Sequence, residues 1–146
     1  MLNNCQRRRR RDESTSSTET IRDAISAVSL ICEVADLERS SVVVALLDSA
    51  GRCDAVVDVV NVDTDDAVVE LVELLSPHLA SRVPGGSVVV ASVRPDGDES
   101  PDDLDRWLEL DACCAAHGLT LLDWFVLGAS LGRPRATLGE PSRWAR

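Results

Sequence analysis

The chain has 146 residues, enough for one domain with its own core, and 45% of them are apolar. Its 25 acidic and 15 basic residues give a formal net charge of −10, and a chain this acidic repels phosphate backbones and anionic membrane surfaces. Only 3% of the residues are aromatic, which leaves few rings on which nucleic-acid bases could stack. The composition therefore argues against nucleic acid as the main ligand.

The first 18 residues are predicted to form a disordered tail, because they are polar, low in complexity and offer almost nothing to bury. A run of arginines in this tail could bind nucleic acid or an acidic partner, although a solvated tail or a wrongly chosen start codon is the simpler interpretation. The segment after the run is polar, unlike a signal peptide, and no apolar run approaches the ~20 residues that span a bilayer. We therefore expect a cytoplasmic protein without a membrane partner. The run consists of Arg7, Arg8, Arg9, Arg10 and Arg11.

The rest of the chain alternates between helix-like and strand-like segments. Apolar residues at helical spacing predict helices, short runs rich in β-branched residues predict buried strands, and Gly- or Asp-rich stretches predict the turns between them. The order predicts an α/β (α+β) fold, a mixed sheet with packed helices, followed by a loose C-terminal tail at 131–146. The predicted elements are a helix over 20–35, a hairpin of strands 41–47 and 53–60, a helix opened by 63–66, a strand at 87–91, a helix over 102–117 and a strand over 119–128.

The cysteines, the histidines and the acidic loop lack the neighbouring residues that a catalytic or metal site would need. The five cysteines form no CxxC pair and are expected to be reduced thiols. His78 and His117 have no nucleophile or metal ligand at a useful spacing, and His117 suits the C-terminal end of a helix. The acidic loop 96–103 would place Trp107 where a calcium-binding EF-hand loop needs Glu, so we interpret it as an exposed loop.

The most specific pattern begins at Val88 and reads Val-Val-Val-Ala-Ser-Val-Arg-Pro-Asp-Gly-Asp-Glu-Ser-Pro-Asp-Asp-Leu-Asp. After the next helix comes Leu121-Leu-Asp-Trp-Phe-Val-Leu-Gly. This resembles the JAB/MPN (JAMM) metalloprotease-like domain, in particular its bacterial RadC-like branch. There a strand ends in His-x-His-Pro-x-Gly-Asp, Pro-Ser-x-x-Asp begins the helix, and the next strand reads Leu-Leu-Asp-His. The resemblance covers about residues 41–130 and implies a JAB/MPN-like (cytidine-deaminase-like) domain over 19–130.

In that family two histidines and one aspartate bind a zinc ion, and the resemblance implies the matching positions in this chain. The histidine positions fall on Ser92 and Arg94, the aspartate on Asp105, and a serine of the motif on Asp102. A serine hydroxyl is a poor zinc ligand, and a guanidinium has no lone pair to donate. Only Asp105 keeps its role, so these four residues are vestigial positions, and no catalytic residue, metal or cofactor is expected.

Other polar groups of the family's site are also missing. The family has a general-base Glu near its second strand, where this chain offers only Asp54 and Asp58, and Trp124 stands in place of a histidine. We expect Arg94 to replace the lost cation and to pair with Asp105. A solvated Arg94 is equally compatible with the sequence.

These observations lead us to expect a catalytically inactive, RadC-like JAB/MPN domain, a pseudoenzyme that acts as a binding or scaffold module for a protein partner. Two alternatives stay open. One is a zinc-dependent JAMM-type hydrolase or isopeptidase with a rebuilt site, and the other is an α/β interaction domain unrelated to this family.

Overall fold

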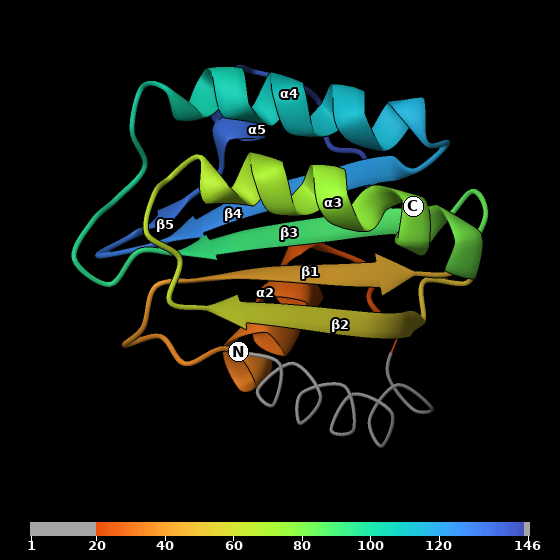
Figure 1. Ribbon diagram of the computed structural model, residues 1–146, viewed down its shortest axis with the longest axis horizontal. Coiled ribbons are helices and arrows are strands. Elements are labelled where there is room, and N and C mark those ends of the chain that lie inside the picture. Colours follow the sequence, from red (N-terminus) through yellow and green to blue (C-terminus); the bar gives the residue numbers. More distant parts are fainter. Residues whose placement is uncertain (1–19, 145–146) are drawn as a thin grey trace.

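A five-stranded mixed sheet forms the centre of the structure, a computed structural model, and helices pack on both faces of the sheet (Figure 1). The structure describes residues 20–144, so the predicted tail over 1–18 lies outside the described residues. The elements are α2 (Ala24–Val34), β1 (Ser41–Leu47), β2 (Cys53–Val60), α3 (Ala67–Arg82), β3 (Ser87–Val93), α4 (Asp103–Ala116), β4 (Thr120–Leu127), β5 (Leu131–Gly132) and α5 (Pro134–Thr137).

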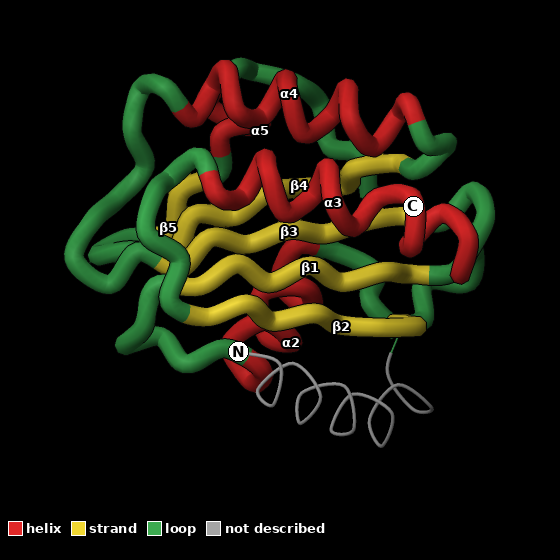
Figure 2. The backbone as a smooth tube through the Cα atoms, viewed as in Figure 1, coloured by secondary structure: helices red, strands yellow, loops and turns green. Residues whose placement is uncertain are grey.

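The strands are ordered β2-β1-β3-β4-β5 across the sheet (Figure 2). β1 is antiparallel to both neighbours, with Ser41 opposite Val60 of β2 and Val93 of β3. β3 and β4 run parallel, and β5 returns antiparallel to β4. A parallel pair needs a long crossover connection, which α4 supplies. The carboxyl ends of β2 and β3 therefore lie at one end of the sheet, beside the loops that lead into α3 and α4.

Alternate side chains of the strands fill two apolar layers, one on each face of the sheet. In β1, Val42, Val44 and Leu46 pack with α3 and α4, whereas Val43 and Ala45 pack with α2. Every residue of β1 is buried, as predicted for a strand that is covered on both faces. The apolar faces of the three long helices thus account for both layers.

The predicted elements and their order are confirmed, with small shifts at their ends. The hairpin forms as β1 and β2, and in its turn Gly51 adopts a φ of 81°, a left-handed conformation that favours glycine. The strand predicted over 87–91 continues to Val93, and the helix predicted from 102 begins at Asp103. The general α/β class is confirmed, whereas the JAB/MPN-like (cytidine-deaminase-like) assignment stays a prediction.

The prediction of a loose C-terminal tail is wrong for residues 131–144, which we call the C-terminal strap. Its first residues form β5 beside β4, and α5 follows at once. The Trp144 side chain lies in the layer covered by α2 and is only 7% exposed. Pro134 does stand at a helix start and Gly139 in a turn, but Gly132 lies in β5, and the segment is docked along its length.

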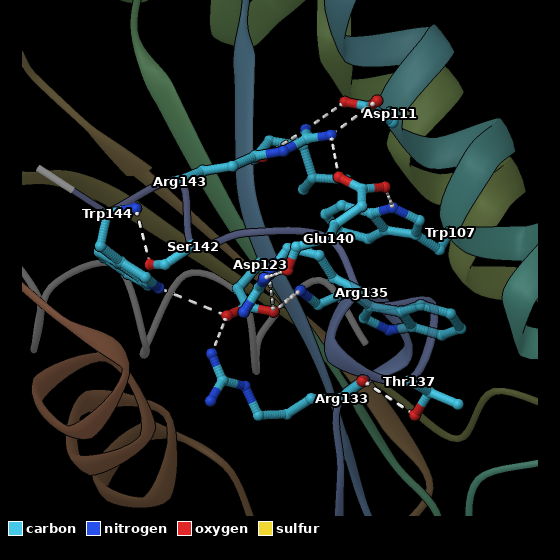
Figure 3. Close-up of polar contacts among 12 residues, drawn as sticks. Trp107, Asp111, Asp123, Arg133, Arg135, Thr137, Glu140, Ser142, Arg143 and Trp144 are labelled. Atoms are coloured by element: carbon cyan, nitrogen blue, oxygen red, sulfur yellow. Dashed lines mark hydrogen bonds and ion pairs between the residues drawn. The ribbon is translucent and has the colours of Figure 1, made fainter.

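Polar contacts fasten the strap to β4 and α4 (Figure 3). Asp123, buried in β4, accepts hydrogen bonds from Arg133 Nη2 at 2.6 Å and from Trp144 Nε1 at 3.3 Å. Arg143 donates to both carboxylate oxygens of Asp111 on α4, at 2.6 and 3.1 Å. These partners lie 10 to 32 residues apart in the sequence, so local composition alone does not reveal them.

Candidate functional site

The residues that match the zinc ligands of the resemblance lie where β3 ends and α4 begins (Figure 2). Ser92 is a buried residue of β3, and Arg94 directly follows the strand. Asp102 and Asp103 stand at the start of α4, and Asp65 lies in the loop between β2 and α3. The fold brings Arg94 to the first turn of α4, as the sequence pattern predicts.

Arg94 lies at the centre of this region, with its side chain 10% exposed. Its Nη1 and Nη2 donate to the two carboxylate oxygens of Asp103, at 2.7 and 2.8 Å. Nη1 also donates to the Asp98 carbonyl oxygen at 3.0 Å, and Nε lies 3.2 Å from a carboxylate oxygen of Asp65. The guanidinium carbon is 6.0 Å from the centre of the Trp124 ring. A two-point pair of this kind fixes the orientation of both groups.

The surroundings of Asp103 favour its ionised form although its side chain is fully buried. Besides the two bonds from Arg94, it accepts the Ser100 N–H at 2.7 Å and Arg106 Nη1 at 2.9 Å. Burial alone would raise the pKa of the Asp103 carboxyl, but the hydrogen bonds from Arg94, Ser100 and Arg106 outweigh it and lower the pKa below its ordinary value. The charge of Asp103 is therefore compensated by two arginines.

Arg106 extends the ion pair to the loop that precedes α3. Its Nε donates to a carboxylate oxygen of Asp66 at 2.9 Å. Burial opposes the charge of Arg106, but its bonds to Asp66 and Asp103 raise the pKa of the guanidinium. We call Arg94, Asp103, Arg106, Asp65 and Asp66 the strand-end cluster. It joins β3 to α4 and to the start of α3, so it sets how both helices begin over the sheet.

Ser92 has a partner within the core. Its Oγ accepts a hydrogen bond from Trp124 Nε1 at 3.0 Å, and both residues are buried. The tryptophan that stands at a histidine position of the resemblance thus bonds to the serine that stands at another. The pair satisfies two buried polar groups that would otherwise be costly to bury.

A cavity of about 70 Å³ lies beside the strand-end cluster and is lined in part by Asp63, Asp65, Ser92 and Arg94. No thiol or imidazole is among the described residues that line it. Within residues 20–144, no three His, Cys, Asp or Glu side chains are grouped so that they could hold a metal ion. Because the Ser92 hydroxyl accepts the bond from an indole and Arg94 has no lone pair to donate, these residues do not fit a zinc ion.

The predicted pairing of Arg94 with Asp105 is wrong, because Asp103 takes that place. Asp105 and Asp102 are both exposed. The phase of α4 explains the difference: Asp103 lies four residues before the buried Trp107 and shares its face, whereas Asp105 lies two residues before Trp107 and points away. Sequence reasoning missed Asp103, although the apolar spacing of this helix carries the signal.

The two aspartates considered in place of a catalytic base lie elsewhere. Asp54 pairs with Arg82 at the C-terminal end of α3, at the opposite end of the sheet from Ser92. Asp58 is buried in β2 opposite Val43, on the face that α2 covers, whereas Ser92 is on the face covered by α3 and α4. Neither aspartate is placed to move a proton at the strand-end cluster.

The acidic loop between β3 and α4 contacts the C-terminal strap. Asp98 Oδ1 accepts a hydrogen bond from the Ser130 N–H at 3.0 Å just before the strap begins, and Glu99 accepts one from Thr137 Oγ1 at 3.1 Å.

His117, at the end of α4, has Nδ1 3.1 Å from the Cys113 carbonyl oxygen, which suits its predicted role at a helix end. These side chains have structural partners.

The chain matches no protein-family model and no curated protein. None of the helices within residues 20–144 has the length and apolar character that crossing a bilayer requires. The strand-end cluster pairs two guanidinium groups with three carboxylates. In the described part of the chain, no nucleophile and base are paired beside them. The strand-end cluster therefore orients the starts of α3 and α4 relative to the end of β3.

Proposed function

We propose that this chain is a catalytically inactive, RadC-like JAB/MPN domain that acts as a binding or scaffold module for a protein partner. The observation that carries the proposal is the ion pair between Arg94 and Asp103. It lies where the resemblance implies a zinc ion, and its Arg94 guanidinium is a fixed positive charge that needs no metal.

Two further observations support this proposal. The order of helices and strands agrees with the order on which the resemblance rests, and Ser92 and Arg94 lie at the end of a strand beside the next helix. In addition, neither Asp54 nor Asp58 lies close enough to act as a general base. A domain whose two aspartates near the expected general-base position both lie away from the strand end is suited to binding rather than to hydrolysis.

A second candidate is an α/β interaction domain unrelated to the JAB/MPN family. It is favoured by the exposure of Asp105, because the resemblance requires this aspartate to face the end of β3. Both candidates are binding modules, and they differ in whether a zinc site can be rebuilt at the strand end.

Rebuilding the site distinguishes the two candidates. If the chain is a JAB/MPN domain, the variant Ser92→His with Arg94→His should bind zinc with Asp105, the aspartate of the motif, as the third ligand. Binding through Asp103, which faces residue 94, would favour the unrelated domain. The JAB/MPN assignment predicts that Asp105→Asn in this background abolishes binding and that the matched Asp103→Asn change leaves it intact, whereas the unrelated domain predicts the reverse or no binding. Zinc binding is measured by isothermal titration calorimetry and by a rise in Tm on adding zinc. A folded double variant without zinc affinity would contradict the JAB/MPN assignment.

A further inference from the structure

The outer side of the helical layer carries an apolar groove between α3 and α4, which lie side by side on one face of the sheet (Figure 1). The groove has a volume of about 460 Å³. Val69, Ala112 and Ala116 line its floor and walls, and the small alanine side chains, one helical turn apart on α4, leave room for larger side chains from outside. Such a groove between two helices can accept apolar side chains of a third helix.

The rim of this groove is acidic. Glu73 of α3 and Glu109 of α4 line the groove from opposite sides and are exposed. Glu70 and Asp105, about one turn earlier on the same helices, are exposed as well. Within residues 20–144 no arginine forms an ion pair with any of these four carboxylates. The groove therefore combines an apolar floor with uncompensated negative charge on both sides.

We propose that this groove binds an amphipathic helix of a partner protein that is rich in arginine or lysine. The apolar side chains of that helix enter between Ala112 and Val69, and its basic side chains pair with Glu73 and Glu109. This inference rests on the proposed function, because it names the partner chemistry of the binding module. A second copy of this helical face is a poor occupant, because it would bring acidic rims together.

The test uses a fluorescein-labelled synthetic peptide of about 18 residues, with leucines at helical spacing and arginines on both flanks. Its binding to the full chain is followed by fluorescence anisotropy. Glu73→Lys with Glu109→Lys should weaken binding about tenfold, whereas the matched control Glu33→Lys with Glu38→Lys, at exposed positions on and beyond α2, should change it less than about twofold. Ala112→Glu should also weaken binding although it adds negative charge, because it blocks the floor of the groove.

A second measurement locates the peptide on the surface. Cys113 lines the groove and is half-buried, so the bound peptide should slow its modification by a thiol reagent. Cys32, which is exposed on α2, should react at the same rate with and without peptide.

Three results would overturn the inference: no binding of the peptide, equal losses in the groove and control variants, or tighter binding to Ala112→Glu. The last two would show attraction to an acidic surface without a specific site. These results would not affect the proposal of an inactive binding module. That proposal would instead be contradicted if the unaltered chain bound zinc.

Discussion

The Arg94 guanidinium and the Asp103 carboxylate form a two-point ion pair inside the protein, with N–O distances of 2.7 and 2.8 Å. The side chain of Asp103 is fully buried, and water reaches little of Arg94. A buried pair of this kind adds little net stability over an apolar pair, but removing one partner leaves an uncompensated charge in the core. Breaking the pair should therefore produce a measurable loss in the free energy of unfolding.

Arg94→Ala should lower the free energy of unfolding by about 3 kcal/mol, because Asp103 would lose its bidentate partner in a buried position. Adding Asp103→Asn should recover part of this loss, with a coupling of about 1–3 kcal/mol in a double-mutant cycle followed by urea denaturation. Arg94→Ala and Asp105→Asn should be additive, since Asp105 is exposed and makes no described contact with Arg94. If the effects of Arg94→Ala and Asp103→Asn on the free energy of unfolding were additive, the ion pair would not be formed in solution.

Acid should destabilise the protein in part through Asp103. Its folded-state pKa is lowered by hydrogen bonds that outweigh burial, so its contribution to stability is complete above the unfolded-state value near 3.8 and is lost as the pH falls through the folded-state pKa. Urea unfolding between about pH 6 and pH 2 should show a shallower acid dependence in Asp103→Asn than in the wild type. Equal slopes for the two proteins would contradict the lowered pKa.

The C-terminal strap should contribute to stability through Trp144. Trp144→Ala should destabilise the fold by about 3 kcal/mol, because it removes a buried aromatic side chain and its bond to Asp123. Leu138→Ala in the same strap is the control, since Leu138 is 41% exposed, and we expect a change within about 0.5 kcal/mol. Differential scanning calorimetry compares the two variants, and a similar effect of both would mean that Trp144 is not docked.

The buried Cys114 on α4 should differ in reactivity from the exposed Cys32. Burial, with smaller effects of Cys113 and Asp111, raises the pKa of the Cys114 thiol to about 12, so almost no reactive thiolate exists near neutral pH. Iodoacetamide should label Cys32 within minutes and Cys114 only after unfolding, as read by peptide mass spectrometry. Rapid labelling of Cys114 in the folded protein would contradict its burial.

Much of the fold could be predicted from the sequence because periodicity is a local signal. The run 41–47 predicts a strand covered on both faces, and β1 has all of its residues buried. The turn at Gly51 predicts the hairpin, and the acidic residues before α3 and α4 mark the starts of these helices. Each of these features depends on neighbouring residues alone.

The contacts that define the candidate site were harder to predict, because they join distant segments. The motif spacing pointed to Asp105, but the position of Trp107 on the buried face of α4 places Asp103 there instead. The strap was missed because Gly and Pro indicate turns, while its docking depends on Arg133 and on the carboxylate of Asp123 in the neighbouring strand β4. Composition does not reveal which partner a charged side chain finds.

The central claim is that arginine, and not a metal ion, supplies the positive charge at the end of β3. The most direct test is equilibrium dialysis of the full chain against zinc, followed by elemental analysis, with Asp103→Asn and Asp105→Asn treated in parallel. We predict that the wild type retains far less than one zinc ion per chain and that neither substitution changes this value. A ratio near one zinc per chain that falls in either aspartate variant would contradict the claim.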